Sequence, residues 1–264
     1  MIKNKLKKLT SICLAVILLS SVSLNAHAGG LVSMVNNIVV IKNDKNNIKE
    51  NVFRGCKNLE QVIIEDGVTK INDSAFRDCI NLTSITIPDS VTEIGTSAFE
   101  GCTSLTDVSI GNGVKDIGVS AFNGCKRLTS ITIPSSITKI SGWAFQGCTS
   151  LTDVDIDNGV EEIGSSAFNG CKRLTSITIP GSVTKINDYA FYKCSNLRSV
   201  TYLGVSDPGK ATYYKGILRV NKNIFDYTEY NAGSHFLKRS YEPVKVPSGY
   251  SDDLFCGRKT IPME

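Results

Sequence analysis

Residues 82–105 read LTSITIPDSVTEIGTSAFEGCTSL, and this stretch decides the fold. Its first part places Ile85 and Ile87 on one side of the chain and Ser84 and Thr86 on the other. This alternation is typical of a β-strand with one buried face. We therefore predict a short strand at the start of the stretch.

The rest of the stretch predicts how the chain returns. Pro88 ends the strand, because a proline nitrogen cannot donate to a neighbouring strand. Residues 97–101 predict one short helical or 3₁₀ turn, with Phe99 pointing inward. Burying each such phenylalanine contributes roughly 1.5–3 kcal/mol.

The same pattern returns every 23 residues without an insertion. A fixed period of this length indicates a solenoid, in which each turn buries its apolar face against the next. We predict a right-handed solenoid over residues 37–202, because crossovers between parallel strands are right-handed. The phased residues are Phe at 53, 76, 99, 122, 145, 168 and 191, Cys at 56, 79, 102, 125, 148, 171 and 194, and Leu at 59, 82, 105, 128, 151, 174 and 197.

A period of 46 residues is superposed on the shorter one. Residues 101–108 recur identically at 147–154, and residues 124–134 recur identically at 170–180. The simplest interpretation is the duplication of a unit of two turns.

The repeat pattern resembles that of the BspA-like leucine-rich repeat family, also called the Treponema pallidum type. The residues that carry the resemblance are Leu82, Ile85, Ile87, Pro88, Val91, Ile94, Gly95, Ala98, Phe99, Cys102 and Leu105. The resemblance implies an α/β leucine-rich repeat solenoid, with short parallel strands on the concave face and short helical or 3₁₀ turns on the convex face. It also implies a surface protein, since several members act as adhesins toward matrix proteins, host cells or other bacteria. It supplies no binding residues.

The N-terminus predicts export. Residues 1–28 contain four lysines, then an apolar run, then Ala26-His27-Ala28, which is the order of a cleaved signal peptide. Residues 29–36 are interpreted as a linker, and no later stretch is apolar enough to span a membrane. The four lysines account for the whole net charge of +4. The mature chain therefore lacks the excess of basic residues that would attract nucleic acid. We expect a secreted or cell-surface protein.

The cysteines of the repeat are interpreted as a reduced ladder in the core, because free cysteine behaves as a small buried apolar residue. Their side chains would lie parallel, which is poor geometry for disulfides between neighbours. A bridge from Cys56 or Cys194 to Cys256 remains an alternative for a terminal member of the ladder.

The outward residues of the strands are the candidate binding surface for an extracellular protein or glycan, in the host matrix or on another cell. The alternative interpretation is a sheet surface that is merely soluble, with good β propensity. Such a face lacks the Trp, Tyr and Arg anchors of tight interfaces, so weak repeated contacts are expected. The candidate residues are Ser84, Thr86, Asp107, Ser109, Ser130, Thr132, Asp153, Asp155, Ser176 and Thr178.

Catalysis is not expected. His235 is the only histidine after the signal peptide, and a nucleophilic pair with Cys256 has no supporting motif. Residues 153–164 superficially resemble a calcium loop, but Asn158 and Gly164 stand where glycine and glutamate are required. We therefore predict no cofactor and no metal.

Residues 203–264 leave the repeat. Thr212-Tyr213-Tyr214 and residues 217–220 predict two strands separated by Lys215-Gly216. The segment is interpreted either as a cap on the open end of the solenoid or as a small β-rich binding module. The leading hypothesis for the whole chain is an adhesin, the second is an envelope scaffold, and the third is a hydrolase sited in this segment.

Overall fold

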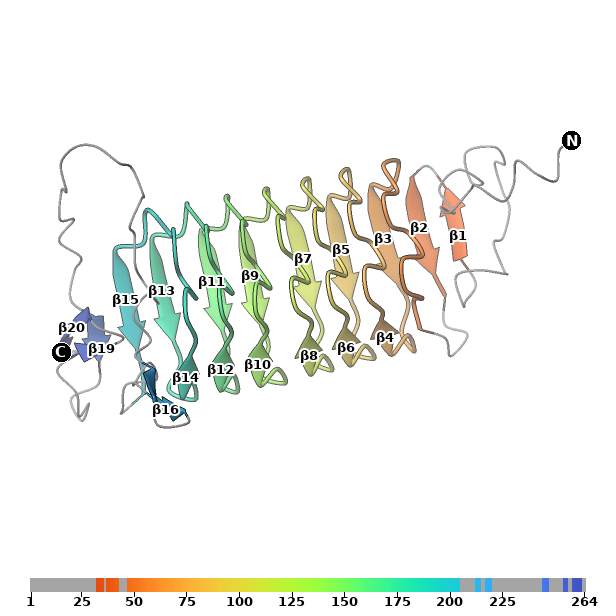
Figure 1. Ribbon diagram of the computed structural model, residues 1–264. Coiled ribbons are helices and arrows are strands. Elements are labelled where there is room, and N and C mark those ends of the chain that lie inside the picture. Colours follow the sequence, from red (N-terminus) through yellow and green to blue (C-terminus); the bar gives the residue numbers. More distant parts are fainter. Residues whose placement is uncertain are drawn as a thin grey trace, which may run out of the picture.

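A computed structural model shows a β-solenoid of about seven turns (Figure 1). The predicted signal peptide, residues 1–28, lies outside the residues that the structure describes, as do His235 and Cys256. The described residues are 32–35, 37–42, 47–204, 212–214, 217–219, 244–246, 254–255 and 258–262.

The predicted strands form the first side of each turn, and Figure 1 shows them side by side along the molecule. Each is four residues long, and neighbours are parallel with a register of 23 residues, as in the pair Ile85↔Val108. The second and fourth residues of each strand point inward, and from the strand Ser84–Ile87 onward they alternate with polar residues. The long strands are β2 (Ile38–Ile41), β3 (Gln61–Ile64), β5 (Ser84–Ile87), β7 (Asp107–Ile110), β9 (Ser130–Ile133), β11 (Asp153–Ile156), β13 (Ser176–Ile179) and β15 (Ser199–Tyr202).

A second sheet forms the second side of each turn, and the sequence did not predict it. Its strands have two residues each, an outward polar residue and a buried isoleucine. They pair in parallel in one uninterrupted order. The short strands are β4 (Lys70–Ile71), β6 (Glu93–Ile94), β8 (Asp116–Ile117), β10 (Lys139–Ile140), β12 (Glu162–Ile163) and β14 (Lys185–Ile186).

The third side of each turn is a tight turn and not a helix, so the prediction of helical or 3₁₀ turns is wrong within the described repeats. In residues 97–101, Ser97 and Gly101 have left-handed φ values of 55° and 75°. The N–H groups of Phe99 and Gly101 donate to the carbonyls of Ala121 and Asn123 in the next turn, at 2.7 and 2.8 Å. These two donors are used between turns, and they alternate with short local bonds such as Glu100 N–H to the Ser97 carbonyl at 3.1 Å, so no continuous helix forms.

The core is a ladder of stacked side chains. The seven phased phenylalanines, from Phe53 to Phe191, stack with ring centroids 5.1–5.4 Å apart and ring planes within 8° of parallel. Each phased leucine is buried as well. The predicted core is confirmed.

The cysteine ladder is confirmed for six of its seven members. The residues from Cys79 to Cys194 are buried free thiols at the 23-residue step. Cys56 is disulfide-bonded, so the expectation of a fully reduced ladder is wrong at its first member. The predicted geometry explains why stacked neighbours remain thiols, because their side chains run parallel.

Added strands cover both edges of the long-strand sheet. At one edge β1 (Val32–Val35), within the segment interpreted as a linker, pairs antiparallel with β2. At the other edge β18 (Val244–Val246) pairs with β15, and β20 (Arg258–Pro262) pairs with β18. β20 also pairs antiparallel with β19 (Leu254–Phe255).

The predicted strands of the C-terminal segment are present. β16 (Thr212–Tyr214) and β17 (Ile217–Arg219) form an antiparallel pair joined by residues 215–216. This arrangement agrees with the hairpin signal of two strand-like runs around Lys215-Gly216.

Candidate binding surface

The ten candidate residues lie on the outward side of the long strands. All except Ser84, which is half-buried, are exposed. Parallel register places them in rows, so that Ser84 lies beside Asp107 and Thr86 beside Ser109. The same arrangement recurs where Asp153 pairs with Ser130.

Two aspartates of this surface are held by their neighbours. Thr106 Oγ1 donates to Asp107 Oδ2 at 2.6 Å. Thr152 Oγ1 makes the same bond to Asp153, also at 2.6 Å. Each carboxylate is therefore oriented along its strand, whereas no described side chain donates to Asp155. The surface presents fixed acceptors at an interval of two turns.

The long-strand sheet is interrupted at two seams, one between β7 and β9 and one between β11 and β13. Elsewhere the residue after a long strand donates its N–H to the preceding turn, as Asp157 does to the Ile133 carbonyl at 3.0 Å. Pro134 and Pro180 occupy this position beyond the seams and have no N–H to donate. Pro88 occupies the same position after β5, yet β3 and β5 still pair and lack only their last register pair. A proline therefore explains the loss of pairing at one end of each seam but not along its whole length.

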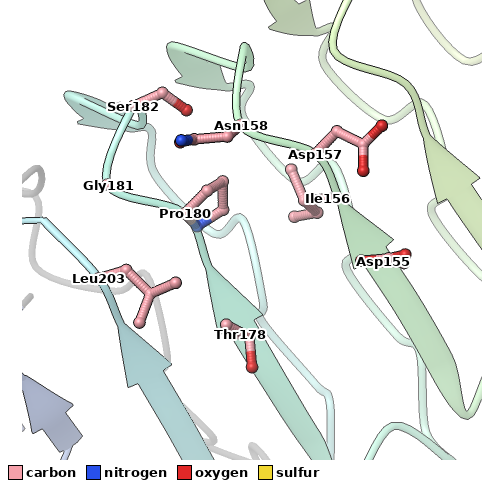
Figure 2. Close-up of a pocket in the computed structure, with 9 residues that line it drawn as sticks. All are labelled: Asp155, Ile156, Asp157, Asn158, Thr178, Pro180, Gly181, Ser182 and Leu203. Carbon is pink, nitrogen blue, oxygen red and sulfur yellow. The ribbon is translucent and has the colours of Figure 1, made fainter.

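A hollow of about 690 Å³ lies at the second seam. Figure 2 shows Asp155 on β11 and Thr178 on β13 at its sides, with Pro180 and Leu203 near its end. Two of the ten candidate residues therefore line a hollow. Its full lining is Asp155, Ile156, Asp157, Asn158, Thr178, Pro180, Gly181, Ser182 and Leu203.

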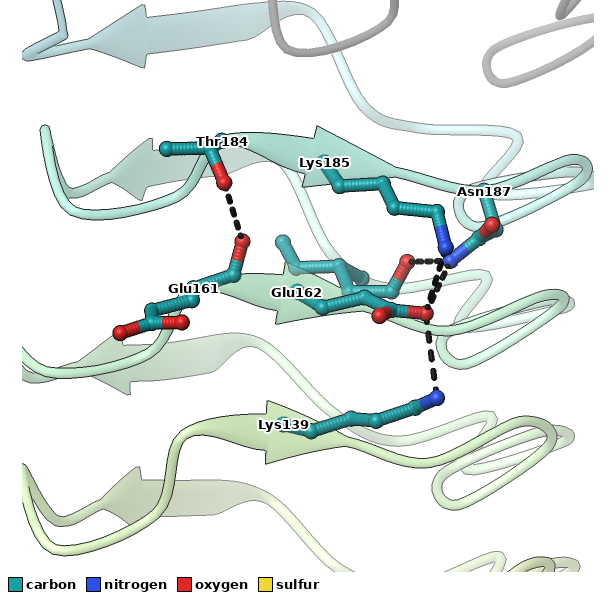
Figure 3. A network of polar contacts seen from close by, with 7 residues as sticks. Lys139, Glu161, Glu162, Thr184, Lys185 and Asn187 are labelled. Carbon is teal, nitrogen blue, oxygen red and sulfur yellow. Dashed lines mark hydrogen bonds and ion pairs between the residues drawn. The ribbon is translucent and has the colours of Figure 1, made fainter.

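The short-strand sheet carries paired charges, whereas most candidate residues of the long-strand face carry hydroxyl groups. Figure 3 shows the Glu162 carboxylate between Lys139 and Lys185, with Nζ to Oε1 distances of 3.1 and 3.3 Å. Asn187 Nδ2 donates to the same oxygen at 2.8 Å. Burial raises the pKa of Glu162, but these three partners outweigh it and hold the pKa below its ordinary value. This face is a network of satisfied charges.

Metal ligation has no support among the described residues, where no three His, Cys, Asp or Glu side chains are grouped to hold an ion. The buried thiols are poor ligands, because burial raises the pKa of Cys79 and Cys148 to about 12 and disfavours the thiolate. The pair considered for catalysis, His235 and Cys256, falls outside the described part. In that part no helix is long and apolar enough to cross a membrane.

Sequence reasoning missed two exposed aromatic residues on the turns. Trp143 and Tyr189 are 45% and 42% exposed and stand 46 residues apart. Both have left-handed φ values, at a position where the intervening turn has Ser166. A signal was available in the sequence, because aromatics replace the serine or asparagine that other repeats carry two residues before the phased phenylalanine.

Comparison with known structures places the fold among bacterial repeat proteins. A leucine-rich repeat protein from T. pallidum is 28% identical, with 70% of this chain and 88% of that one covered and a TM-score of 0.50. One from Bacteroides ovatus is 24% identical, with 69% of each chain covered and a TM-score of 0.44. A leucine-rich cell surface protein from Faecalibacterium prausnitzii is 21% identical, covering 61% of this chain and 72% of that one at a TM-score of 0.27.

Among curated proteins, none matches the chain. The repeat family described as the BspA type leucine-rich repeat region matches residues 33–148 and 115–215, in six copies. These ranges include all of the stacked phenylalanines and extend beyond the predicted end of the repeats at residue 202. With its period, its core ladder and this match in agreement, the chain belongs to the family of BspA-type leucine-rich repeat proteins.

Proposed function

We propose that the protein is a secreted or cell-surface adhesin, which binds an extracellular protein of the host matrix or of a neighbouring cell through the outward face of its long strands. Family membership supports a binding role without catalysis. The observation that supports the proposal is the placement of the ten candidate residues on one face, nine of them exposed and in register within each paired group of strands.

The geometry favours many weak contacts over one strong contact. Hydroxyl groups recur along the face on β5, β7, β9 and β13, where neighbouring strands of a sheet lie about 4.8 Å apart, whereas β11 carries Asp153 and Asp155. The candidate residues are therefore spread over five strands and are not gathered at one point. Repetition raises the effective concentration of each further contact once the first has formed.

The experiment is binding of the purified protein to immobilised matrix proteins and to whole cells. The test variant changes Thr86, Thr132 and Thr178 to lysine, because these residues are exposed at 46-residue intervals on the long-strand face. We expect saturable binding by the unmodified protein, and an affinity at least about tenfold lower for the variant, since charge is introduced at three contact points.

The matched control changes Thr92, Thr138 and Thr184 to lysine. These threonines have the same spacing and are also exposed, but they lie beside the short strands. We expect the control to bind like the unmodified protein. Equal losses in both variants would contradict the choice of face, and absence of binding to every matrix protein and cell would favour the envelope scaffold.

A further inference from the structure

The tight turns form a third face that differs along the molecule. We define this turn face by the residues that run in each repeat from one left-handed position to the next. Its segments are 51–55, 74–78, 97–101, 120–124, 143–147, 166–170 and 189–193. Neither the strand face nor the core ladder includes their outward side chains.

The first position of each segment is left-handed, with φ between 54° and 61°. Serine occupies it at 74, 97, 120 and 166, and asparagine at 51, which are residue types that tolerate this conformation. Trp143 and Tyr189 are the exceptions. A bulky side chain with positive φ is an outlier, and such strain is typical of functional positions.

Both aromatic residues are nearly half exposed, and the ring of Tyr189 also makes an edge contact with the ring of Tyr192, with centroids 5.4 Å apart. They are two turns apart, and Ser166 on the turn between them is small and buried. Two strand spacings amount to about 10 Å, which is the length of a disaccharide unit in an extended polysaccharide. The rings therefore form two platforms with a gap between them.

Uncommitted amide groups lie beside these platforms. Asn123, Gln146 and Asn169 occupy the fourth position of three successive segments and are half-buried. No side-chain hydrogen bond joins these three amides to any other described residue. The amides of Asn72 and Asn81, by contrast, donate to carbonyls of the preceding turn at 2.8 and 2.7 Å.

The turn face is neutral over the three segments that hold Trp143 and the amides, whereas the stretch around Tyr189 carries Asp188 and Lys193. Residues 118–124, 141–147 and 164–170 contain no charged side chain. Nearer the N-terminus the same face carries ion pairs, such as Arg77 Nη2 to Glu100 Oε1 at 3.2 Å. The adjoining segment ends with Lys193 over the ring of Tyr192, at 5.2 Å.

We propose that the turn face between residues 120 and 193 binds a neutral polysaccharide. The rings of Trp143 and Tyr189 stack on the C–H faces of sugars, because aromatic side chains combine an apolar face with a polar edge. The amides of Asn123, Gln146 and Asn169 supply donors and acceptors for hydroxyl groups. A linear chain of repeating sugars fits a linear row of repeating groups.

The experiment uses Trp143, which is the only tryptophan of the chain, as its own reporter. The purified protein is titrated with soluble xylan, galactomannan and mixed-linkage β-glucan, and with heparin as an anionic comparison. We expect a saturable blue shift of tryptophan fluorescence with at least one neutral polysaccharide, and no shift with heparin. No response to any neutral polysaccharide, or a response to heparin alone, would overturn the proposal.

Variants identify the platforms. Trp143→Ser and Tyr189→Ser introduce the residue that other repeats carry at this left-handed position, so we expect the Tm to be unchanged or raised. Calorimetric affinity for the bound polysaccharide should fall at least about tenfold in the double variant. Gln146→Ala should lower it by a smaller factor. Unaltered affinity in the double variant would contradict the assignment.

The matched control is the variant with lysine at Thr86, Thr132 and Thr178. It should retain the polysaccharide affinity, because these residues lie on the long-strand face. The double serine variant should in turn retain binding to matrix proteins. Loss of matrix-protein binding can therefore be told apart from loss of polysaccharide binding. If the turn face were found to bind a matrix protein, a protein partner would replace the polysaccharide in the proposal.

Discussion

Each phased cysteine has a hydrogen-bonding role as well as a packing role. The carbonyl of Phe99 accepts the N–H of Cys102 at 3.2 Å, and it also accepts the thiol of Cys125 in the next turn at 3.3 Å. The same thiol contact, between 3.0 and 3.4 Å, recurs for the six cysteines from Cys79 to Cys194. Cysteine is small enough for the core and still carries a weak donor, which alanine or valine would lack.

We predict that the buried thiols resist alkylation in the folded protein. Burial raises the pKa of Cys79 and Cys148 to about 12, and raises the pKa of Cys102, Cys125 and Cys171 well above the ordinary value. At pH 9 they remain protonated and out of reach, so iodoacetamide should leave them unmodified for hours. Mass spectrometry checks this, with the protein in denaturant as the control that is alkylated. Rapid labelling of these five in the native state would contradict the ladder.

Because of the same thiols, we predict that the protein loses stability in alkaline solution. A thiol whose pKa is raised in the folded state is protonated in both states below pH 9 and ionises first in the unfolded chain. The free energy of unfolding therefore falls as the pH rises from about 9 to about 12. Urea titrations at pH 8 and pH 10.5 measure the fall, and Cys148→Ala should make it less steep. An equal slope in this variant would argue against the assignment.

The sequence was sufficient to predict most of the core at the scale of residues. Phenylalanine, cysteine and leucine recur at one step, and a fixed step makes their stacking a geometric consequence. It was not sufficient for Cys56, because the repeat places only the ladder cysteines and the other six of them are free thiols. The conformation at Trp143 was also missed, since a left-handed turn is shared by the whole row of repeats and is set by hydrogen bonds between turns.

At the scale of elements, the short-strand sheet carries charge that alternates along most of its length. Its outward residues in order are Lys70, Glu93, Asp116, Lys139, Glu162 and Lys185. Parallel register brings opposite charges together, as in the contact of Lys70 Nζ with Glu93 Oε1 at 2.8 Å. Cross-strand pairs of this kind help to fix the register between neighbouring turns.

We predict that Glu162→Gln lowers stability more at neutral pH than in acid. Three partners hold the carboxylate (Figure 3), but both lysines are half exposed and solvent screens the pairs. The loss should be about 0.5–1 kcal/mol, or roughly 2 °C in Tm. A depressed pKa contributes stability above pH 4.5 that is lost as the pH falls through the folded-state value. The deficit should therefore be smaller at pH 3 than at pH 7.

Calorimetry at pH 7 and pH 3 measures this effect. The control is Glu161→Gln, one residue earlier, where the side chain is exposed and the bonds from Thr184 and Lys185 are accepted by the backbone carbonyl. It should leave the Tm unchanged at both values. A deficit of Glu162→Gln that is equally large at pH 3 would show that packing, and not charge, is responsible.

Sequence patterns differ in how well they predict elements. The long strands were predicted because four residues are enough for alternation to show, as in Ser84–Ile87. The short strands were not, because two residues contain no period. The helical turn was predicted wrongly over residues 97–101, since Ala-Phe-Glu suits a helix locally while every second N–H group, such as that of Phe99, is used by the next turn. Hydrogen bonds between turns outweighed local preference.

For the candidate surface, the sequence predicted which residues face outward but not where the sheet is interrupted. The exposed positions of the long strands follow from alternation alone. The seams, including the one beside Asp155 and Thr178, depend on backbone pairing between turns. The prolines at 134 and 180 indicate only one end of each seam. The hollow of Figure 2 could therefore be recognised only in three dimensions.

At the scale of the whole molecule, the repeating unit is two turns long. The seams of the long-strand sheet fall 46 residues apart, while the short-strand sheet and the stacked rings run through without interruption. Each turn contacts mainly its neighbours, so stability is approximately a sum over turns and the interfaces between them. Residues 121–134 and 167–180 are identical, which allows one unit to be removed at a junction that recreates the native sequence.

We predict that deletion of residues 124–169 leaves a folded protein. The cut joins Asn123 to Gly170, a dipeptide that already exists at 123–124, and it keeps each core position in phase. The variant should unfold cooperatively, with native-like circular dichroism per residue and a modestly lower Tm, since interfaces are lost in number but not in kind. The control deletes residues 124–158, which removes fewer residues but shifts the phenylalanine, cysteine and leucine ladders out of register. It should aggregate or remain unfolded, because apolar positions would face solvent. If the protein lacking residues 124–158 were the more stable of the two, the 23-residue period would not be the basis of the fold.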